Sequence, residues 1–231
     1  MMHIHVTKNT RARWGVIFDV DGTMVDNAAY HANAWIELGR RHGLPITGEY
    51  YRTHIHARSN DKNVQGLFAG RATPEVVEKL GSEKEAIYRD SFRPVIAEIP
   101  GLTNLLKAFN AGGIPCAAAS NSPRENVDMV LDELDIRRYF RVVIDRGQIA
   151  RGKPDPEMFL TAAARLGLGP ERCLVVEDSH SGFKAAENAG MKYIVITAGA
   201  DEEELKQATR AAAMHHDFTR ICPGELAALL D

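Results

Sequence analysis

The sequence predicts an α/β protein, a doubly wound parallel sheet of the Rossmann-like kind with a small α-helical cap domain inserted into it. Short apolar runs alternate with stretches of helical period along most of the chain. The stretch 26–97 keeps helical character and contains no β-like run. We therefore expect a core domain from residues 1–25 and 98–231 and a cap domain from residues 26–97. Of the 231 residues, 45% are apolar, which is enough to bury a core.

The first apolar run, Gly15 to Phe18, is typical of a short buried strand, and it ends at Asp19 and Asp21, followed by Gly22. In open α/β sheets, ligands bind at the carboxyl ends of the strands. Two carboxylates this close raise each other's pKa unless a cation or a shared proton relieves the repulsion. An acidic surface turn is the alternative, because Asp-Gly is a common turn dipeptide.

Within the inserted block, the helical period predicts helices at 27–42, 59–68 and 82–92. Asp26 or Asn27 can cap the first helix, and Gly43 can end it. Ser82 with Glu85 three residues on matches a capping box, so we expect the third helix to begin at Ser82. Pro100-Gly101 is the expected return to the core domain.

Beyond Gly101, strand and helix alternate. The expected strands are 114–119, 141–145, 173–176 and 192–197, and the expected helices are 102–111, 123–134, 156–166 and 182–189. Ser122 and Glu125 suggest a second capping box, with Pro123 in the first turn. Repeated βα units of this kind predict a parallel sheet with helices on both faces and right-handed crossovers.

Polar residues end three of the predicted strands, and a lysine precedes one of the helices; they are Asp19/Asp21, Ser120/Asn121, Glu177/Asp178 and Lys153. Because parallel strands share one carboxyl edge, these side chains can converge. Together they supply a nucleophile, an acid or base, a hydroxyl, a cation and metal ligands, an inventory that suits phosphoryl transfer. Each also has a simpler explanation: Ser120 as a helix or turn cap, Lys153 as a solvated lysine, Glu177 as a structural residue.

Four ordered motifs resemble those of the haloacid dehalogenase (HAD) superfamily. They are Asp19-x-Asp21-Gly22-Thr23, Ser120 after an apolar strand, Gly152-Lys153-Pro154-x-Pro156, and Val176-Glu177-Asp178-Ser179-x-Ser181-Gly182. The inserted helical block resembles the cap of the β-phosphoglucomutase-like and phosphoglycolate phosphatase-like branch. The resemblance covers the chain from about Gly15 to Thr197 and implies a HAD core with that cap.

The resemblance implies that Asp19 attacks phosphorus and becomes an aspartyl phosphate. Asp21 starts protonated, acts as general acid for the leaving oxygen and then as base. Ser120 and Lys153 hold phosphoryl oxygens, and Asn121 adds a substrate contact. Mg²⁺ is bound by Asp19, by the main-chain carbonyl of Asp21 and by Asp178, with Glu177 as a further ligand or support. The dehalogenase lacks an aspartate at the position of Asp21, so dehalogenation is not expected.

Three cap residues lie at or beside positions that resemble substrate-binding positions of this branch: His31, Arg58 and Lys84. His31 stands in a Tyr-His-x-x-x-Trp pattern like that of β-phosphoglucomutases, although its helical position also fits an ordinary core histidine. Arg58 lies one position from the mutase arginine, and Ala57 replaces a glycine of many relatives. The neighbouring His54 and His56 could bind an anion or be solvated, and no cysteine partners them at zinc-ligand spacing.

The formal net charge of −3 gives no basic surface for nucleic acid, and the composition offers no transmembrane run or export signal. The odd number and wide separation of Cys116, Cys173 and Cys222 indicate reduced core thiols and a cytoplasmic location. We expect a monomer or weak homo-oligomer.

The predicted function is a Mg²⁺-dependent phosphatase of small phosphorylated metabolites, most simply sugar phosphates. A β-phosphoglucomutase is the alternative enzyme, and a catalytically silent binding or regulatory protein is the alternative of another class.

Overall fold

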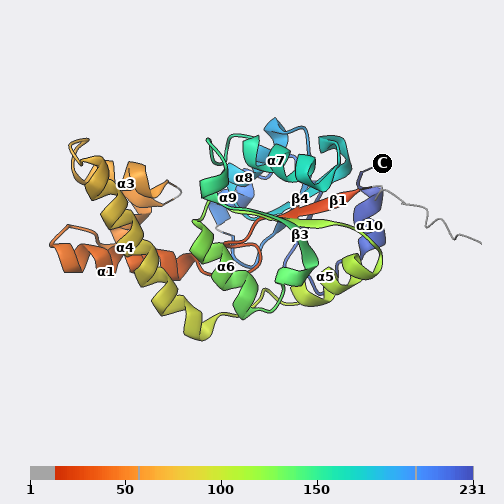
Figure 1. The fold of residues 1–231 in the computed structure, drawn as a ribbon, viewed down its shortest axis with the longest axis horizontal. Helices are drawn as coiled ribbons and strands as arrows, with labels where there is room; N and C mark the ends of the chain where they lie inside the picture. The colour runs from red at the N-terminus through yellow and green to blue at the C-terminus, as the bar shows by residue number, and fades with distance from the viewer. Residues whose placement is uncertain (1–13, 57, 201, 231) are drawn as a thin grey trace, which may run out of the picture.

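The computed structural model describes residues 14–56, 58–200 and 202–230. Its centre is a six-stranded sheet in the order β3-β2-β1-β4-β5-β6, in which every neighbouring pair is parallel (Figure 1). The strands are β1 (Gly15–Phe18), β2 (Cys116–Ala119), β3 (Phe140–Ile144), β4 (Cys173–Glu177), β5 (Lys192–Ile196) and β6 (Ala213–His215). The sequence predicted the first five and missed β6, whose three residues are too few to show a strand pattern.

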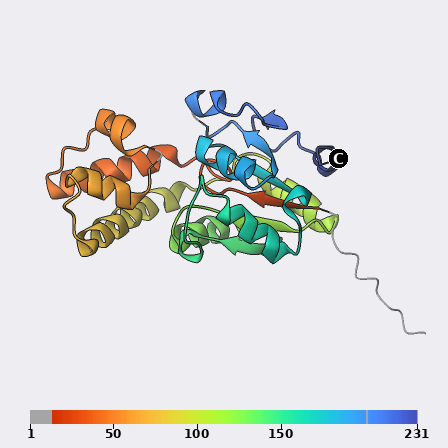
Figure 2. The same ribbon diagram turned by 90° about the horizontal axis from the view of Figure 1, so that it is seen from above.

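Helices cover both faces of the sheet, so the predicted doubly wound fold is confirmed (Figures 1 and 2). One face carries α5 (Leu102–Ala111), α6 (Arg124–Glu133) and α10 (Pro223–Ala228), and the other carries α7 (Glu157–Leu166), α8 (His180–Asn188) and α9 (Glu202–Lys206). Alternate residues of β1 enter the two cores: Phe18 packs near Phe109 of α5, whereas Ile17 joins the core under α7. β1 is therefore buried on both faces, which fixes the position of the residues that follow it.

The helices that follow β1 and precede α5 extend away from the sheet (Figure 2). They are α1 (Ala28–His42), α2 (Gly48–Tyr50), a π-helical turn (Tyr51–Ile55), α3 (Asn60–Leu67) and α4 (Pro74–Phe92). Short 3₁₀ turns lie at Arg93–Val95, Arg137–Tyr139, Arg146–Gln148 and Pro170–Arg172. Trp35 of α1 and Tyr88 of α4 belong to the same buried cluster as Phe18, so apolar packing runs from these helices into the core. The domain boundaries after residues 25 and 97 stay a prediction.

The expected start of a helix at Ser82 is wrong. α4 begins eight residues earlier, at Pro74, after Thr73, whose side chain accepts a hydrogen bond from the backbone N–H of Val76. Ser82 is an exposed residue inside this helix. Gly81 does not break the helix; a Cβ at this position would lie 3.7 Å from Cβ of Asn60 in α3, an ordinary van der Waals distance.

The prediction of core thiols holds for Cys116 and Cys173, which are buried, and is wrong for Cys222, which is exposed just before α10; all three are free. Among the described residues, none of the helices is long and apolar enough to span a membrane.

Candidate active site

The chain turns sharply after β1, and this turn places both aspartates at the carboxyl edge of the sheet. The backbone N–H of Asp19 still bonds to the carbonyl of Val176 on β4, at 2.9 Å. Gly22 then adopts a φ of +82°, which L side chains rarely adopt. A Cβ at Gly22 would lie 2.0 Å from a carboxylate oxygen of Asp178. Glycine at this position therefore allows the first and last motifs to meet.

Lys153 lies against two buried carboxylates. Its ammonium donates hydrogen bonds to Asp19, to Oε1 of Glu177 at 2.7 Å, and to the carbonyl of Ala119 at 3.1 Å. Burial acts to lower the pKa of this lysine, but the charges of Asp19 and Glu177 outweigh burial and raise it. Only 2% of the Lys153 side chain is exposed, which excludes a solvated lysine.

Asp19, Glu177 and Asp178 form a cluster in which one carboxylate oxygen of each residue lies within 4.8 Å of the other two. Burial is the main cause that raises the pKa of Asp19 and of Asp178, and neighbouring carboxylates add to it. Lys153 alone leaves this group of three acids with an excess of negative charge. A hard divalent cation with oxygen ligands would supply the missing positive charge, so the donor set fits the predicted Mg²⁺.

The three acids are not equivalent as ligands. Oε1 of Glu177 bonds to Lys153, and Oε2 accepts bonds from the backbone N–H groups of Asp178 and Ser179, at 2.9 and 3.0 Å, and from the Ser179 hydroxyl. Asp178 accepts one bond on Oδ1, from the hydroxyl of Thr23 at 2.8 Å. Glu177 therefore orients the loop and Lys153, which favours the supporting role over direct ligation.

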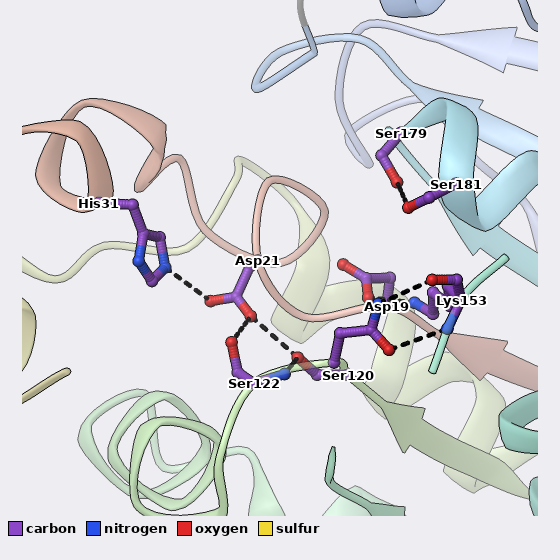
Figure 3. Close-up of a pocket in the computed structure, with 9 residues that line it drawn as sticks. Asp19, Asp21, His31, Ser120, Ser122, Lys153, Ser179 and Ser181 are labelled. Carbon is purple, nitrogen blue, oxygen red and sulfur yellow. Dashed lines mark hydrogen bonds and ion pairs between the residues drawn. The ribbon is translucent and has the colours of Figure 1, made fainter. Parts of the chain in front are cut away.

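Asp21 lies across the pocket from this cluster and accepts several hydrogen bonds (Figure 3). Its Oδ2 accepts from the hydroxyls of Ser120 and Ser122, at 2.9 and 2.7 Å, and its Oδ1 accepts from Asn27 at 2.7 Å. Burial acts to raise the pKa of Asp21, but His31, Ser122 and Asn27 outweigh it and hold the pKa well below its ordinary value. Every partner in this geometry stabilises the carboxylate, so the protonated start expected of Asp21 stays a prediction about the substrate complex.

Ser122 and Asn27 are the site residues that sequence reasoning missed, because each fitted a helix cap. Asn27 occupies the N-cap position of α1 and Ser122 precedes Pro123, the N-cap residue of α6; neither side chain caps a helix. Asn27 instead bridges Asp21 and the hydroxyl of Tyr88, with both distances 2.7 Å. The sequence signal that could have identified Ser122 is a second serine, after Ser120, close to the end of the predicted strand 114–119.

Ser120 and Asn121 support the site from the end of β2. The Ser120 hydroxyl accepts a bond from the N–H of Ser122 and donates to Asp21, so it does not cap a helix. Asn121 accepts from the backbone N–H of Lys153 at 3.0 Å and donates to its carbonyl at 3.4 Å. A Cβ at Gly152 would lie 2.5 Å from the Asn121 amide oxygen. Asn121 thus aligns the Lys153 loop as well as facing the pocket.

Of the predicted cap residues, His31 and Lys84 reach the site and Arg58 does not. The His31 ring stacks on Tyr88, with centroids 3.8 Å apart, and its Nε2 lies 3.7 Å from Asp21. The buried Lys84 ammonium lies 2.7 Å from Nδ1 of His31. A charged ammonium can only donate, so Nδ1 accepts and the ring proton faces Asp21. Arg58 is exposed on the loop before α3.

The other cap expectations have a plain outcome. His54 is exposed and stacks on Tyr50, and His56 is exposed, as expected of solvated side chains. Ala57 lies outside the described residues.

The pocket has a volume of about 190 Å³ and is lined entirely by polar or charged residues: Asp19, Asp21, His31, Ser120, Asn121, Ser122, Lys153, Ser179 and Ser181. Such a cavity suits a small anionic ligand.

The fold and the four motifs agree with a family model. The model for haloacid dehalogenase-like hydrolases matches residues 15–190, and the chain belongs to this family of enzymes. It is 30% identical over 182 residues to the phosphorylated carbohydrates phosphatase of Thermotoga maritima, which covers 78% of this chain and 82% of the relative. It is also 30% identical over 191 residues to the beta-phosphoglucomutase of Bacillus subtilis, covering 80% and 83%.

Among solved structures, a HAD hydrolase of family IA, variant 3, from Entamoeba histolytica is similar, with a TM-score of 0.86 and 28% identity over 94% of this chain and 99% of that chain. The predicted resemblance and fold class are therefore confirmed.

Proposed function

We propose that this protein is a Mg²⁺-dependent phosphatase of small phosphorylated metabolites, with sugar phosphates as the substrate class. The observation that carries the proposal is the arrangement around Asp19. Lys153 bonds to its carboxylate, Asp178 lies beside it, and Asp21 lies across one small polar pocket. This arrangement supports in-line displacement at phosphorus, which requires alignment and charge neutralisation above all.

In the proposed reaction, an oxygen of Asp19 forms a bond to phosphorus while the ester oxygen leaves. The leaving oxygen takes a proton from Asp21, and Asp21 then removes a proton from the water that hydrolyses the aspartyl phosphate. Ser120 and Lys153 hold the phosphoryl oxygens. The acid step requires Asp21 first to take up a proton from solvent and to give up some of its bonds to Ser122 and Asn27, because these donors favour its ionised form.

Asp19, Asp178 and the main-chain carbonyl of Asp21 are the groups that would hold Mg²⁺. When bound, Mg²⁺ neutralises charge on the transferred phosphoryl group. Glu177 would keep Lys153 and the Asp178 loop in place.

A β-phosphoglucomutase is the second candidate, and His31 favours it, because this residue, which resembles the mutase histidine, lies 3.7 Å from Asp21. Such an enzyme returns the phosphoryl group to a sugar hydroxyl instead of water. Incubation with Mg²⁺, β-glucose 1-phosphate and a trace of the 1,6-bisphosphate separates the two. Glucose 6-phosphate without net phosphate release would overturn the phosphatase proposal.

A panel of sugar phosphates, with phosphate release as the readout, tests the proposal itself. We expect release by the parent protein and none by Asp19→Asn. No release by the parent on the whole panel with Mg²⁺ would revive the catalytically silent alternative, and equal release by both proteins would contradict the role of Asp19. A cytoplasmic location and a monomeric or weakly oligomeric state stay predictions.

A further inference from the structure

A buried polar contact joins α4 to α6, outside the residues that line the pocket. Asn126 of α6 donates its amide N–H to Oε2 of Glu85 at 2.7 Å, and its amide oxygen accepts from Arg89 at 2.8 Å. Asn126 is only 1% exposed and Glu85 7%. Both ends of the asparagine amide are thus bonded to α4, in a place where water cannot replace a lost partner.

Glu85 also contacts α3 and its own neighbour in α4, Lys84. Its Oε1 accepts from Asn60 of α3 at 2.7 Å and from the ammonium of Lys84 at 3.0 Å. Lys84 in turn contacts Nδ1 of His31, whose other ring nitrogen faces Asp21. A continuous series of contacts therefore runs from α6 through Glu85 and Lys84 to the proposed general acid.

We infer that Glu85 and Asn126 are positioning residues: their buried hydrogen bond fixes α4 against α6 and thereby keeps Lys84 on His31 at the Asp21 side of the pocket. This inference rests on the proposed function in one respect, that Asp21 delivers the proton. Neither residue touches the pocket, so each acts through Lys84 and His31. Burial opposes the charge of Glu85, and Lys84, His31 and the two asparagines outweigh it and lower its pKa.

The geometry permits a test in which the hydrogen bond is reversed without changing side-chain shape. Glu85→Gln places an amide against the donor of Asn126, and Asn126→Asp places a carboxylate against Glu85. In the double variant, the amide N–H of the new glutamine donates to the new aspartate, which still accepts from Arg89. The amide oxygen of the glutamine still accepts from Asn60 and Lys84. We therefore expect the single variants to be defective and the double variant Glu85→Gln/Asn126→Asp to recover.

The readout compares an alkyl phosphate, whose leaving oxygen needs a proton, with p-nitrophenyl phosphate, whose leaving group does not. Each single variant is expected to lower kcat/KM about tenfold for the alkyl ester and less than about threefold for the aryl ester. The double variant is expected to return within about threefold of the parent on both. The double variant Arg93→Gln/Glu133→Gln is the matched control. Arg93 and Glu133 also join the end of α4 to α6, at 2.9 Å, but this ion pair is exposed. The control variant should therefore change neither rate.

A second measurement does not depend on activity. Lys84 lies 6.0 Å from the ring centroid of Trp35, so displacement of its ammonium should shift Trp35 fluorescence. In a Trp14→Phe background, which leaves Trp35 as the other of the two tryptophans, the single variants should shift the emission and the double variant should restore it. If the parent released no phosphate, the proposed function would be wrong, but the Trp35 emission would still test whether Glu85 and Asn126 position Lys84.

Three results would overturn the inference: unchanged kinetics and emission in both single variants, equal losses on the two substrates, or a double variant no better than the worse single variant. Equal losses would indicate general destabilisation. If a single variant did not fold, Arg89→Lys, which weakens the other bond of Asn126, replaces it and is expected to show the same preference for loss on the alkyl ester.

Discussion

Ser122 donates a hydrogen bond of 2.7 Å to Oδ2 of Asp21, from a position 101 residues away in the chain. The bond joins the ends of β2 and β1, which are neighbouring parallel strands. It is one of the bonds that hold the Asp21 carboxylate in its ionised form, together with those from Ser120 and Asn27.

Ser122→Ala should therefore change the pH dependence of the rate without unfolding the protein. Loss of a hydrogen bond to a charged group costs about 1.5–3 kcal/mol and raises the pKa of Asp21, so we expect the pH profile of kcat on a sugar phosphate to move to higher pH by about one unit. Phosphate release at saturating substrate, followed across pH, measures the profile. Ser91→Ala is the control, because the Ser91 hydroxyl bonds to a backbone carbonyl within α4. A pH profile equal to that of the parent would contradict the role of Ser122.

Asp21→Asn should separate the two halves of the reaction. The amide can neither protonate the leaving oxygen nor activate water, so a substrate with a good leaving group should phosphorylate Asp19 and leave the aspartyl phosphate long-lived. Mass spectrometry of the intact protein measures the added phosphoryl group. Release of the group as fast as in the parent would contradict the acid and base role of Asp21.

Lys153→Met should make stability depend on pH in a defined direction. Removing one partner of a buried ion pair costs about 3–5 kcal/mol, because Asp19 and Glu177 then remain buried without their counter-charge. The pKa of Asp19 and of Asp178 is raised in the folded state, so the folded form binds more protons than the unfolded form above the ordinary aspartate pKa. Stability contributed by these groups is therefore lost as pH rises through their folded pKa.

Urea unfolding of metal-free Lys153→Met should accordingly show greater stability at about pH 5 than at about pH 8. The parent protein, which retains the ammonium, serves as the control and should show a weaker dependence. A variant that is more stable at the higher pH would contradict this account of the cluster.

Addition of Mg²⁺ should stabilise the folded protein, since a ligand that binds only the folded state raises its stability. We expect the thermal midpoint of the metal-free parent to rise by a few degrees at Mg²⁺ concentrations about 100 times the dissociation constant. Asp178→Asn should lose most of this shift, whereas Asp155→Asn, which removes an exposed ion pair with Arg151, should keep it. An equal shift in Asp178→Asn would exclude Asp178 as a ligand.

The cysteines should differ in reactivity. Burial raises the pKa of the Cys116 thiol to about 12 and is the main cause that raises that of Cys173 to about 11, so neither forms much thiolate near neutral pH. Cys222 is exposed. A thiol reagent should label one cysteine per chain quickly in the native protein and the other two only after unfolding. Loss of the fast phase in Cys222→Ser confirms the assignment.

Much of the fold follows from local patterns in the sequence. The five predicted strands became β1 to β5; β1, β2 and β4 are buried along their whole length, which requires continuous apolar residues over most of each strand. The crossover rule then placed Asp19, Ser120 and Glu177 at one sheet edge. Gly112-Gly113 ended α5 as expected, with Gly113 at a φ of +66°. The start of α4 was misplaced because Ser82 and Glu85 match a capping box although they lie inside a helix that Thr73 caps.

The sequence by itself determined the class of protein: the order of strands and helices, the four motifs and the acidic and basic groups of the site. Tertiary structure alone decided how these groups pair. In the folded protein, Ser122 and Asn27 donate hydrogen bonds to Asp21 instead of capping helices, and Arg58 is exposed. Glu85 and Asn126 form a hydrogen bond between two helices. Helical and strand periods depend on neighbouring residues, whereas a hydrogen bond between distant residues depends on where the crossovers bring them together.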